Sequence, residues 1–169
     1  MIQKVNEIMK KTILIFSLIS FSLAVAGQDS LQQARLKSLQ GKIASFSTFA
    51  KKDSLFLICF WSATSDESIT ELNSINANLE KWQSMKPFRF MAISVDEGKL
   101  VNRMRPTYNM NGWTFDVYSD LYGDLRRALH SNNFPQSMIV YKNDIIYEQS
   151  GWNEGTENYL IQRLLSMKN

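Results

Sequence analysis

Residues 55–61 form an uninterrupted apolar run, LFLICFW, in the first half of the chain. A run without a polar face predicts a strand that is buried on both sides, as in a parallel sheet. After a short polar turn, apolar residues recur every three or four positions, at Ile69, Leu72, Ile75, Leu79, Trp82 and Met85. This spacing predicts one face of an amphipathic helix. Thr64 and Glu67 have the spacing of a capping box, which predicts that Thr64 caps this helix.

The rest of the chain alternates between strand and helix patterns. Further strands are expected over residues 88–95, 136–141 and 145–149, the last two joined by a turn at Asn143-Asp144. Residues 30–40 indicate a short helix or irregular arm, and residues 41–49 an edge strand or hairpin. Helices are expected over 99–109, interrupted at Pro106, over 125–131, capped by Asp124, and over 153–168. This order predicts an α/β fold with a central mixed sheet flanked by helices.

Residues 1–26 have the pattern of a secretory signal peptide. They begin with Lys4, Lys10 and Lys11, continue as an apolar stretch and end in the cleavage motif Ala24-Val25-Ala26. We therefore expect cleavage near Ala26, which leaves a domain of residues 27–169 in the periplasm or outside the cell. The alternative is a retained membrane anchor, although the apolar stretch is short and rich in serine.

Removal of this segment changes the charge of the protein. Residues 1–26 hold three of the 19 Lys and Arg and one of the 16 Asp and Glu, so the remaining 16 basic and 15 acidic residues give a net charge of +1. This balance gives no support for nucleic-acid binding. No Cys/His or HExxH spacing indicates a metal, and no glycine-rich loop indicates a nucleotide, so neither a metal nor a cofactor is expected.

The apolar run and the following helix resemble the active-site region of the thioredoxin superfamily, in particular the secreted TlpA/ResA-like thiol-disulfide oxidoreductases. The family pattern is F-W-A-x-W-C-x-x-C followed by E-L, and Phe60-Trp61 and Glu71-Leu72 match its two ends. Later matches are the element Val95-Asp96-Glu97, the segment 113–120, and a proline loop at Pro135. The resemblance implies a thioredoxin-like fold with an N-terminal extension and a cis Phe134–Pro135 bond.

The same register shows that both cysteines of the motif are replaced. Ser65 and Ser68 stand at the cysteine positions, with Asp66-Glu67 between them, and Thr64 stands at the second tryptophan. A dithiol enzyme needs a thiolate at a helix N-terminus and a second thiol that resolves the mixed disulfide. A serine hydroxyl stays protonated at neutral pH and forms no disulfide. We therefore expect no catalytic residue at these positions.

Cys59 and His130 are the single cysteine and the single histidine of the chain. Family members often carry a polar residue at the position of Cys59, where it moves protons. Within an apolar strand, however, a free cysteine behaves as a small hydrophobic residue whose pKa is raised, so we interpret Cys59 as structural. A hydrolase that pairs Ser65 with His130 is a further alternative, but no G-x-S-x-G elbow is present, and the serines are expected to cap the helix.

These observations favour a redox-inactive, thioredoxin-like binding module of the cell envelope. In thioredoxin-like proteins an extended peptide pairs with the residue before the cis-proline. The resemblance therefore implies a binding site made of Thr64, Ser65, Ser68, Phe134 and Pro135, whose partner is an envelope protein or peptide. The alternative is a TlpA/ResA-type thiol-disulfide oxidoreductase that serves cell redox homeostasis through atypical residues, such as Cys59 with a partner thiol.

Overall fold

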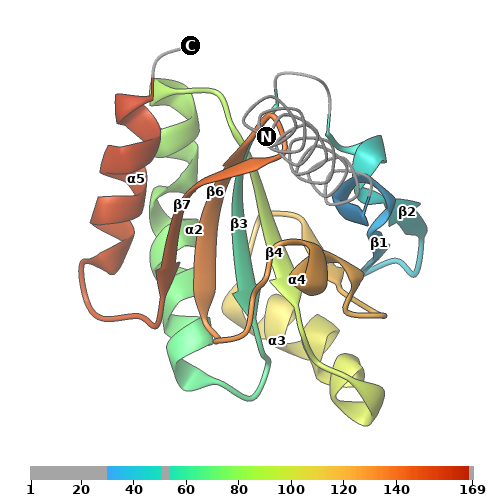
Figure 1. Ribbon diagram of the computed structural model, residues 1–169. Helices are drawn as coiled ribbons and strands as arrows, with labels where there is room; N and C mark the ends of the chain where they lie inside the picture. Colours follow the sequence, from blue (N-terminus) through green and yellow to red (C-terminus); the bar gives the residue numbers. More distant parts are fainter. Residues whose placement is uncertain (1–29, 51–53, 168–169) are drawn as a thin grey trace, which may run out of the picture.

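The computed structural model describes residues 30–50 and 54–167 (Figure 1). The predicted signal peptide, residues 1–26, lies outside these ranges. The described residues form a mixed sheet with the strand order β2-β1-β5-β4-β3-β6-β7. Its strands are Arg35–Ser38 (β1), Ile43–Ser45 (β2), Leu55–Trp61 (β3), Arg89–Ser94 (β4), Val117–Ser119 (β5), Gln136–Tyr141 (β6) and Asp144–Ser150 (β7). Strands β3, β4 and β5 are parallel to one another, whereas β6, β7 and the β1–β2 hairpin add antiparallel pairings on either side.

Helices cover both faces of this sheet. The helices and 3-10 turns are Phe46–Thr48 (η1), Asp66–Met85 (α2), Gly98–Arg103 (η2), Met104–Asn111 (α3), Asp124–Ala128 (α4) and Thr156–Ser166 (α5). Helices α2 and α5 lie side by side on one face (Figure 1). Helix α4 packs on the other face, together with Leu31, Ala34 and Phe46, which flank the hairpin strands. Within the described ranges, no helix combines the length and the apolar character that crossing a bilayer would require.

Strand β3 contributes to both hydrophobic cores, as its uninterrupted apolar run predicts. Its odd-numbered side chains from 57 to 61 pack under α2 and α5, and its even-numbered side chains from 56 to 60 pack under α4 and the hairpin. None of these six side chains is more than 2% exposed. The prediction of a strand buried on both faces is confirmed.

The start of α2 corrects the predicted capping box. Ser65 is the N-cap, and its hydroxyl accepts a hydrogen bond from the backbone N–H of Ser68 at 3.2 Å. The hydroxyl of Thr64 instead bonds to that of Ser62, with 2.9 Å between the oxygens. The cap is displaced by one residue because a turn, closed by the Ser65 N–H and the Ser62 carbonyl, brings Ser65 next to the first helical amides. At the other end, Met85 is 58% exposed and does not extend the buried face of α2.

The cap of α4 also differs from the prediction. Asp124 is the first residue of this helix, and the preceding Gly123 is in the left-handed conformation. The carboxylate of Asp120 takes the capping role, since it accepts hydrogen bonds from the backbone N–H groups of Leu125 and Arg126 at 3.1 and 2.8 Å. The sequence pattern does not indicate Asp120 as the cap. This residue lies four positions before the helix, and its contact with the helical N–H groups depends on the shape of the intervening loop.

Three connections differ as well. Residues 30–33 are helical, as expected, but strand β1 follows within residues 30–40, so the hairpin begins earlier than predicted. The β6–β7 turn is formed by Lys142 and Asn143, both with positive φ, and Asp144 already belongs to β7. Pro106 lies in the first turn of α3, where a missing N–H removes no intrahelical hydrogen bond, so the helix continues through it.

Candidate functional site

The predicted site lies at the end of the sheet where β3 and β4 terminate. Phe60, near the end of β3, pairs with Gln136, the first residue of β6. This pairing brings the preceding Phe134–Pro135 loop to the same edge as the β3–α2 loop. Figure 1 shows both loops at the lower end of the sheet. The structure therefore gathers the predicted residues of the two loops at one edge.

Asp96, directly after β4, fastens the β3–α2 loop. One carboxylate oxygen accepts a hydrogen bond from the Ser62 hydroxyl at 2.6 Å, and the other accepts from the Ala63 N–H at 2.9 Å. The Ser94 hydroxyl also donates to this carboxylate at 2.9 Å. Asp96 is only 5% exposed. The sequence indicated Asp96 only as part of the resemblance and not in this role. The signal that could have shown it is its position directly after β4, since the ends of neighbouring parallel strands meet at one edge.

Ser65 and Ser68, which the resemblance places at the two cysteine positions, differ in exposure. Ser65 is half-buried and caps α2, whereas Ser68 is fully buried. The Ser68 hydroxyl accepts a hydrogen bond from the Ser62 N–H at 3.4 Å. Among the described residues, no hydrogen bond joins either serine to His130, which is exposed beyond the end of α4. The serines thus hold the turn together, and these contacts give no support to a hydrolase.

A buried carboxyl group lies one helical turn after Ser68. Glu71 is 1% exposed and accepts a hydrogen bond from the Ser137 hydroxyl at 2.8 Å. Its other oxygen accepts from the Cys59 thiol at 3.5 Å. Cys59 and Ser137 face each other across β3 and β6, and both are fully buried. From the sequence, Glu71 was indicated only as part of the Glu71-Leu72 match to the family pattern, and its position beside Cys59 was not predicted.

Burial dominates the acid–base properties of this group. Burial raises the pKa of Glu71, and the hydrogen bonds from Ser137 and Cys59 offset part of that rise. Burial also raises the pKa of the Cys59 thiol well above its ordinary value, and the negative charge of Glu71 raises it further. A thiol in this environment stays protonated and has no access to solvent, which agrees with the structural interpretation of Cys59.

The proline loop completes the site. The Phe134–Pro135 peptide bond is cis, as the resemblance implies. The ring of Phe134 is half-buried and lies 6.5 Å from the ring of Phe60, centroid to centroid. The carbonyl of Pro135 accepts a hydrogen bond from the Gly151 N–H at 2.8 Å. This bond ties the loop to the end of β7.

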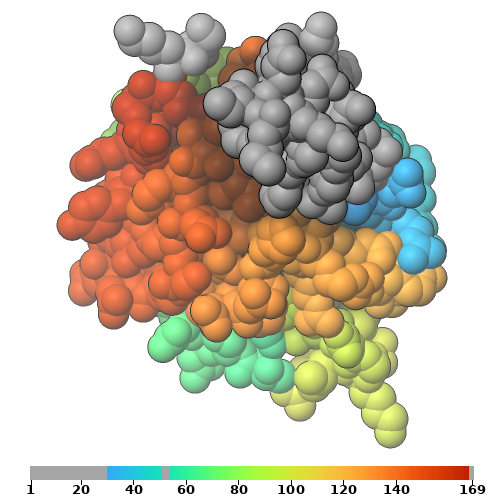
Figure 2. All heavy atoms as spheres, viewed as in Figure 1, coloured from blue at the N-terminus to red at the C-terminus, as the bar shows by residue number. Residues whose placement is uncertain are grey.

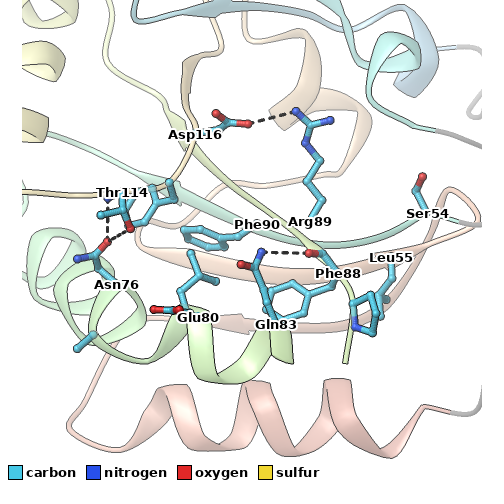
Figure 3. A pocket seen from close by; sticks show the side chains of 14 residues that line it. Ser54, Leu55, Asn76, Glu80, Gln83, Phe88, Arg89, Phe90, Thr114 and Asp116 are labelled. Carbon is cyan, nitrogen blue, oxygen red and sulfur yellow. Dashed lines mark hydrogen bonds and ion pairs between the residues drawn. The ribbon is translucent and has the colours of Figure 1, made fainter. Parts of the chain in front are cut away.

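A larger hollow, of about 790 Å³, lies away from this edge (Figure 3). It is bounded by the first residues of β3 and β4 and by the middle of α2, at the opposite end of the parallel strands. Asn76 accepts hydrogen bonds from the N–H and the hydroxyl of Thr114, and Arg89 pairs with Asp116. None of the predicted site residues lines this hollow. Across residues 30–50 and 54–167, no group of three or more His, Cys, Asp and Glu is placed to hold a metal ion.

Comparison with known proteins identifies similar structures. No protein-family model matches the chain, and no curated protein is similar enough to match it. An uncharacterized thioredoxin-like protein from Porphyromonas gingivalis is 29% identical over 80% of this chain and 89% of its own, with a TM-score of 0.67. A putative thiol:disulfide interchange protein DsbE from Chlorobium tepidum is 18% identical over 78% of this chain and 90% of its own, with a TM-score of 0.66. StoA from Bacillus subtilis is 16% identical over 77% of this chain and 94% of its own, with a TM-score of 0.63. With these neighbours and its helix-flanked mixed sheet, the chain has a thioredoxin-like fold with an N-terminal extension.

Proposed function

We propose that this chain is a redox-inactive, thioredoxin-like module of the cell envelope that binds an extended segment of a peptide or protein. The binding surface consists of Thr64 and Ser65 in the β3–α2 loop together with Phe134 and Pro135. Ser68 contributes from beneath by holding the loop, since its side chain is fully buried.

The proposal is carried by the unpaired backbone of Phe134. Among the described residues, no hydrogen bond engages its N–H or its carbonyl, whereas the neighbouring Pro135 carbonyl is already bonded to Gly151. An extended segment that lies antiparallel to this residue would satisfy both groups by strand addition. The half-buried ring of Phe134 offers apolar contact beside these backbone groups.

Loss of dithiol chemistry follows from the residues themselves. A single cysteine cannot form an internal disulfide, and Ser65 and Ser68 have no thiol that could attack or resolve one. Both hydroxyl groups are engaged as hydrogen-bond acceptors within the loop. A site without a reactive thiol favours a binding function over catalysis of thiol-disulfide exchange.

NMR titration tests this proposal. Residues 27–169, labelled with ¹⁵N, are titrated with acetylated seven-residue peptides of alternating valine and serine. We expect the amide signals of Thr64, Ser65 and Phe134 to shift, and that of Thr114, in the distant hollow, to stay unchanged. Unchanged signals at the first three residues at millimolar peptide would overturn the proposal.

A pair of variants isolates the backbone contribution. Phe134→Ala and Phe134→Pro both remove the ring, but only the second removes the backbone donor. If strand addition occurs, Phe134→Pro should bind the peptides about three- to tenfold more weakly than Phe134→Ala, the value of one net hydrogen bond. The Gly151 amide signal reports whether the loop of each variant is intact. Equal affinities for the two variants would argue against backbone pairing.

The second candidate is a thiol-disulfide oxidoreductase that acts through Cys59, and the names of several structural neighbours favour it. They include a putative thiol:disulfide interchange protein and a putative protein disulfide isomerase. This candidate requires exposure of a thiol that is fully buried and whose pKa is raised.

Insulin reduction distinguishes the two candidates. We expect the wild-type chain to reduce insulin no faster than Cys59→Ala, and a thiol reagent to label Cys59 only after unfolding. Turnover by the wild type that Cys59→Ala abolishes would establish the oxidoreductase and remove the binding-module proposal.

A further inference from the structure

A second hollow, of about 410 Å³, adjoins the proposed binding surface. It is lined by Arg126, Arg127, His130, Ser131, Asn132 and Phe134. Phe134 belongs to both features, so a segment paired with its backbone would run past this hollow, which we call the arginine hollow.

The arginine hollow is cationic. Its lining holds two guanidinium groups and an exposed imidazole and contains no acidic side chain. Arg126 pairs with Glu97 at 2.5 Å, and Arg127 pairs with Asp124 at 2.8 Å. Each pair uses one terminal nitrogen, whereas a guanidinium carries five N–H donors. Both arginines therefore keep donors for an additional acceptor.

The acidic groups near these arginines lie outside the lining of the hollow. Asp124 is shared, because Arg35 also donates to it at 2.9 Å. Arg35, Arg126 and Arg127 thus share two carboxylates in ion pairs, and the buried carboxylate of Asp120 also lies near Arg126. None of these carboxylates lines the hollow, and the side chain of Arg127 is 64% exposed, so the hollow itself presents guanidinium groups on the side of the binding surface that belongs to α4.

The other side of the binding surface has the opposite charge. Asp66 and Glu67, the first residues of α2, are exposed and belong to the same end of the sheet. A segment that crosses from the β3–α2 loop to α4 therefore meets negative charge first and positive charge last. This polarity disfavours acidic side chains near α2 and favours them near α4.

We propose that the partner of this site is an acidic extended peptide segment, one of whose carboxylate side chains enters the arginine hollow and bonds to Arg126 and Arg127. This inference rests on the proposed peptide-binding function and specifies the chemical class of the partner. Hydrogen bonds between a guanidinium and a carboxylate are among the stronger polar contacts in proteins, so the hollow would fix the direction and register of the segment.

Three peptides of equal length test the inference. Each is an acetylated peptide of alternating valine and serine in which one residue is replaced by glutamate, glutamine or lysine. The replacement is made at each position of the peptide in turn. We expect the best glutamate peptide to bind the wild type on the order of tenfold more tightly than its glutamine counterpart, which is the size of a charge-assisted hydrogen bond. The lysine peptide should bind most weakly, and added salt should reduce the differences in affinity among the three peptides.

Two variants identify the groups responsible. Arg127→Gln should weaken binding of the glutamate peptide far more than binding of the glutamine peptide, and so remove most of the preference for glutamate. Arg163→Gln makes the same charge change at an exposed position on α5 and should preserve the preference. Similar affinities of the three peptides for the wild type, or equal effects of the two variants, would overturn the inference.

The outcomes separate this inference from the function on which it rests. Equal binding of all three peptides with signal shifts at Phe134 would leave the binding function intact and remove the acidic preference. No shift at Phe134 with any peptide would remove both. Competition by acetate as effective as that by the glutamate peptide would show a simple anion site, and would also overturn the inference.

Discussion

At the scale of single residues, two buried carboxyl groups determine the character of the site edge. Asp96 receives hydrogen bonds from the loop that carries Ser65, whereas Glu71 lies beneath that loop with Cys59 and Ser137. Asp96 holds the loop at the surface, and Glu71 places an ionisable group in the interior.

Glu71 is expected to make stability depend on pH. Burial raises its pKa in the folded chain above the ordinary value of 4.5, so the carboxyl ionises more readily when unfolded. Its contribution to stability is then fully present below pH 4.5 and is lost as pH rises through the folded-state pKa. Glu71→Gln cannot ionise, so its stability relative to the wild type should increase with pH.

Urea unfolding between pH 4 and 8 measures this difference. Glu148→Gln, at an exposed position on β7, is the control and should follow the wild type. A stability difference between Glu71→Gln and the wild type that stays constant with pH would contradict the prediction.

Asp96→Ala is expected to destabilise the protein by about 2–3 kcal/mol, because it leaves buried donors of the β3–α2 loop without an acceptor. Chemical denaturation measures the loss. Asp116→Ala removes an exposed carboxylate with one arginine partner and should cost less than about 1 kcal/mol. A similar small loss for Asp96→Ala would mean that water replaces the carboxylate without penalty.

At the scale of secondary-structure elements, two serine hydroxyls hold the start of α2 to the preceding loop. Ser65 caps the helix, and Ser68 lies one turn further, with its hydroxyl turned back to the loop. Both hydroxyl groups therefore serve to stabilise the turn before α2.

The two candidate caps are distinguishable by substitution. Ser65→Ala should lower the free energy of unfolding by about 1 kcal/mol, since it removes the acceptor for the Ser68 N–H. Thr64→Ala removes only an exposed hydroxyl contact and should cost less than about 0.5 kcal/mol. Thermal or urea unfolding measures the loss for each variant. A larger loss for Thr64→Ala than for Ser65→Ala would indicate that Thr64 is the cap of α2.

The double substitution Ser65→Cys and Ser68→Cys should close a disulfide on oxidation. Ser65 is the N-cap and Ser68 lies one helical turn further, so their Cα atoms are expected to fall within the range of about 4.4–6.8 Å that a disulfide requires. Counting free thiols under denaturing conditions should give one, from Cys59. Three free thiols in a folded, oxidised variant would mean that the motif register is wrong.

At the scale of the whole molecule, the thioredoxin-like fold places two loops far apart in sequence at one edge. The parallel strands β3 and β4 end there, and β6 begins there because it runs antiparallel to β3. The proposed binding surface and the arginine hollow both depend on this arrangement, since they share Phe134.

Export is expected from the signal pattern near the start of the sequence. The signal pattern of residues 1–26 predicts that the protein isolated from its native envelope begins at Gly27. The intact mass of that protein measures the cleavage site. A membrane-associated form that retains residues 1–26 would instead indicate an anchor.

The sequence by itself determined the features that depend on local pattern. The apolar run of β3, the helical period of α2 and the order of strands and helices predicted the α/β fold, because burial on one or both faces imposes a characteristic spacing of apolar residues. The resemblance also predicted the cis Phe134–Pro135 bond, which is confirmed, whereas the assignment of Ser65 and Ser68 to the cysteine positions stays a prediction.

Only the tertiary structure decided which polar groups meet. Asp120 displaced Asp124 as the cap of α4, Asp96 secured a loop more than thirty residues away in sequence, and Glu71 came to lie between Cys59 and Ser137. Such contacts depend on loop shape and strand register, which no local period encodes. A single acidic residue looks the same in sequence whether it faces water or a buried thiol, and the fold alone makes that choice.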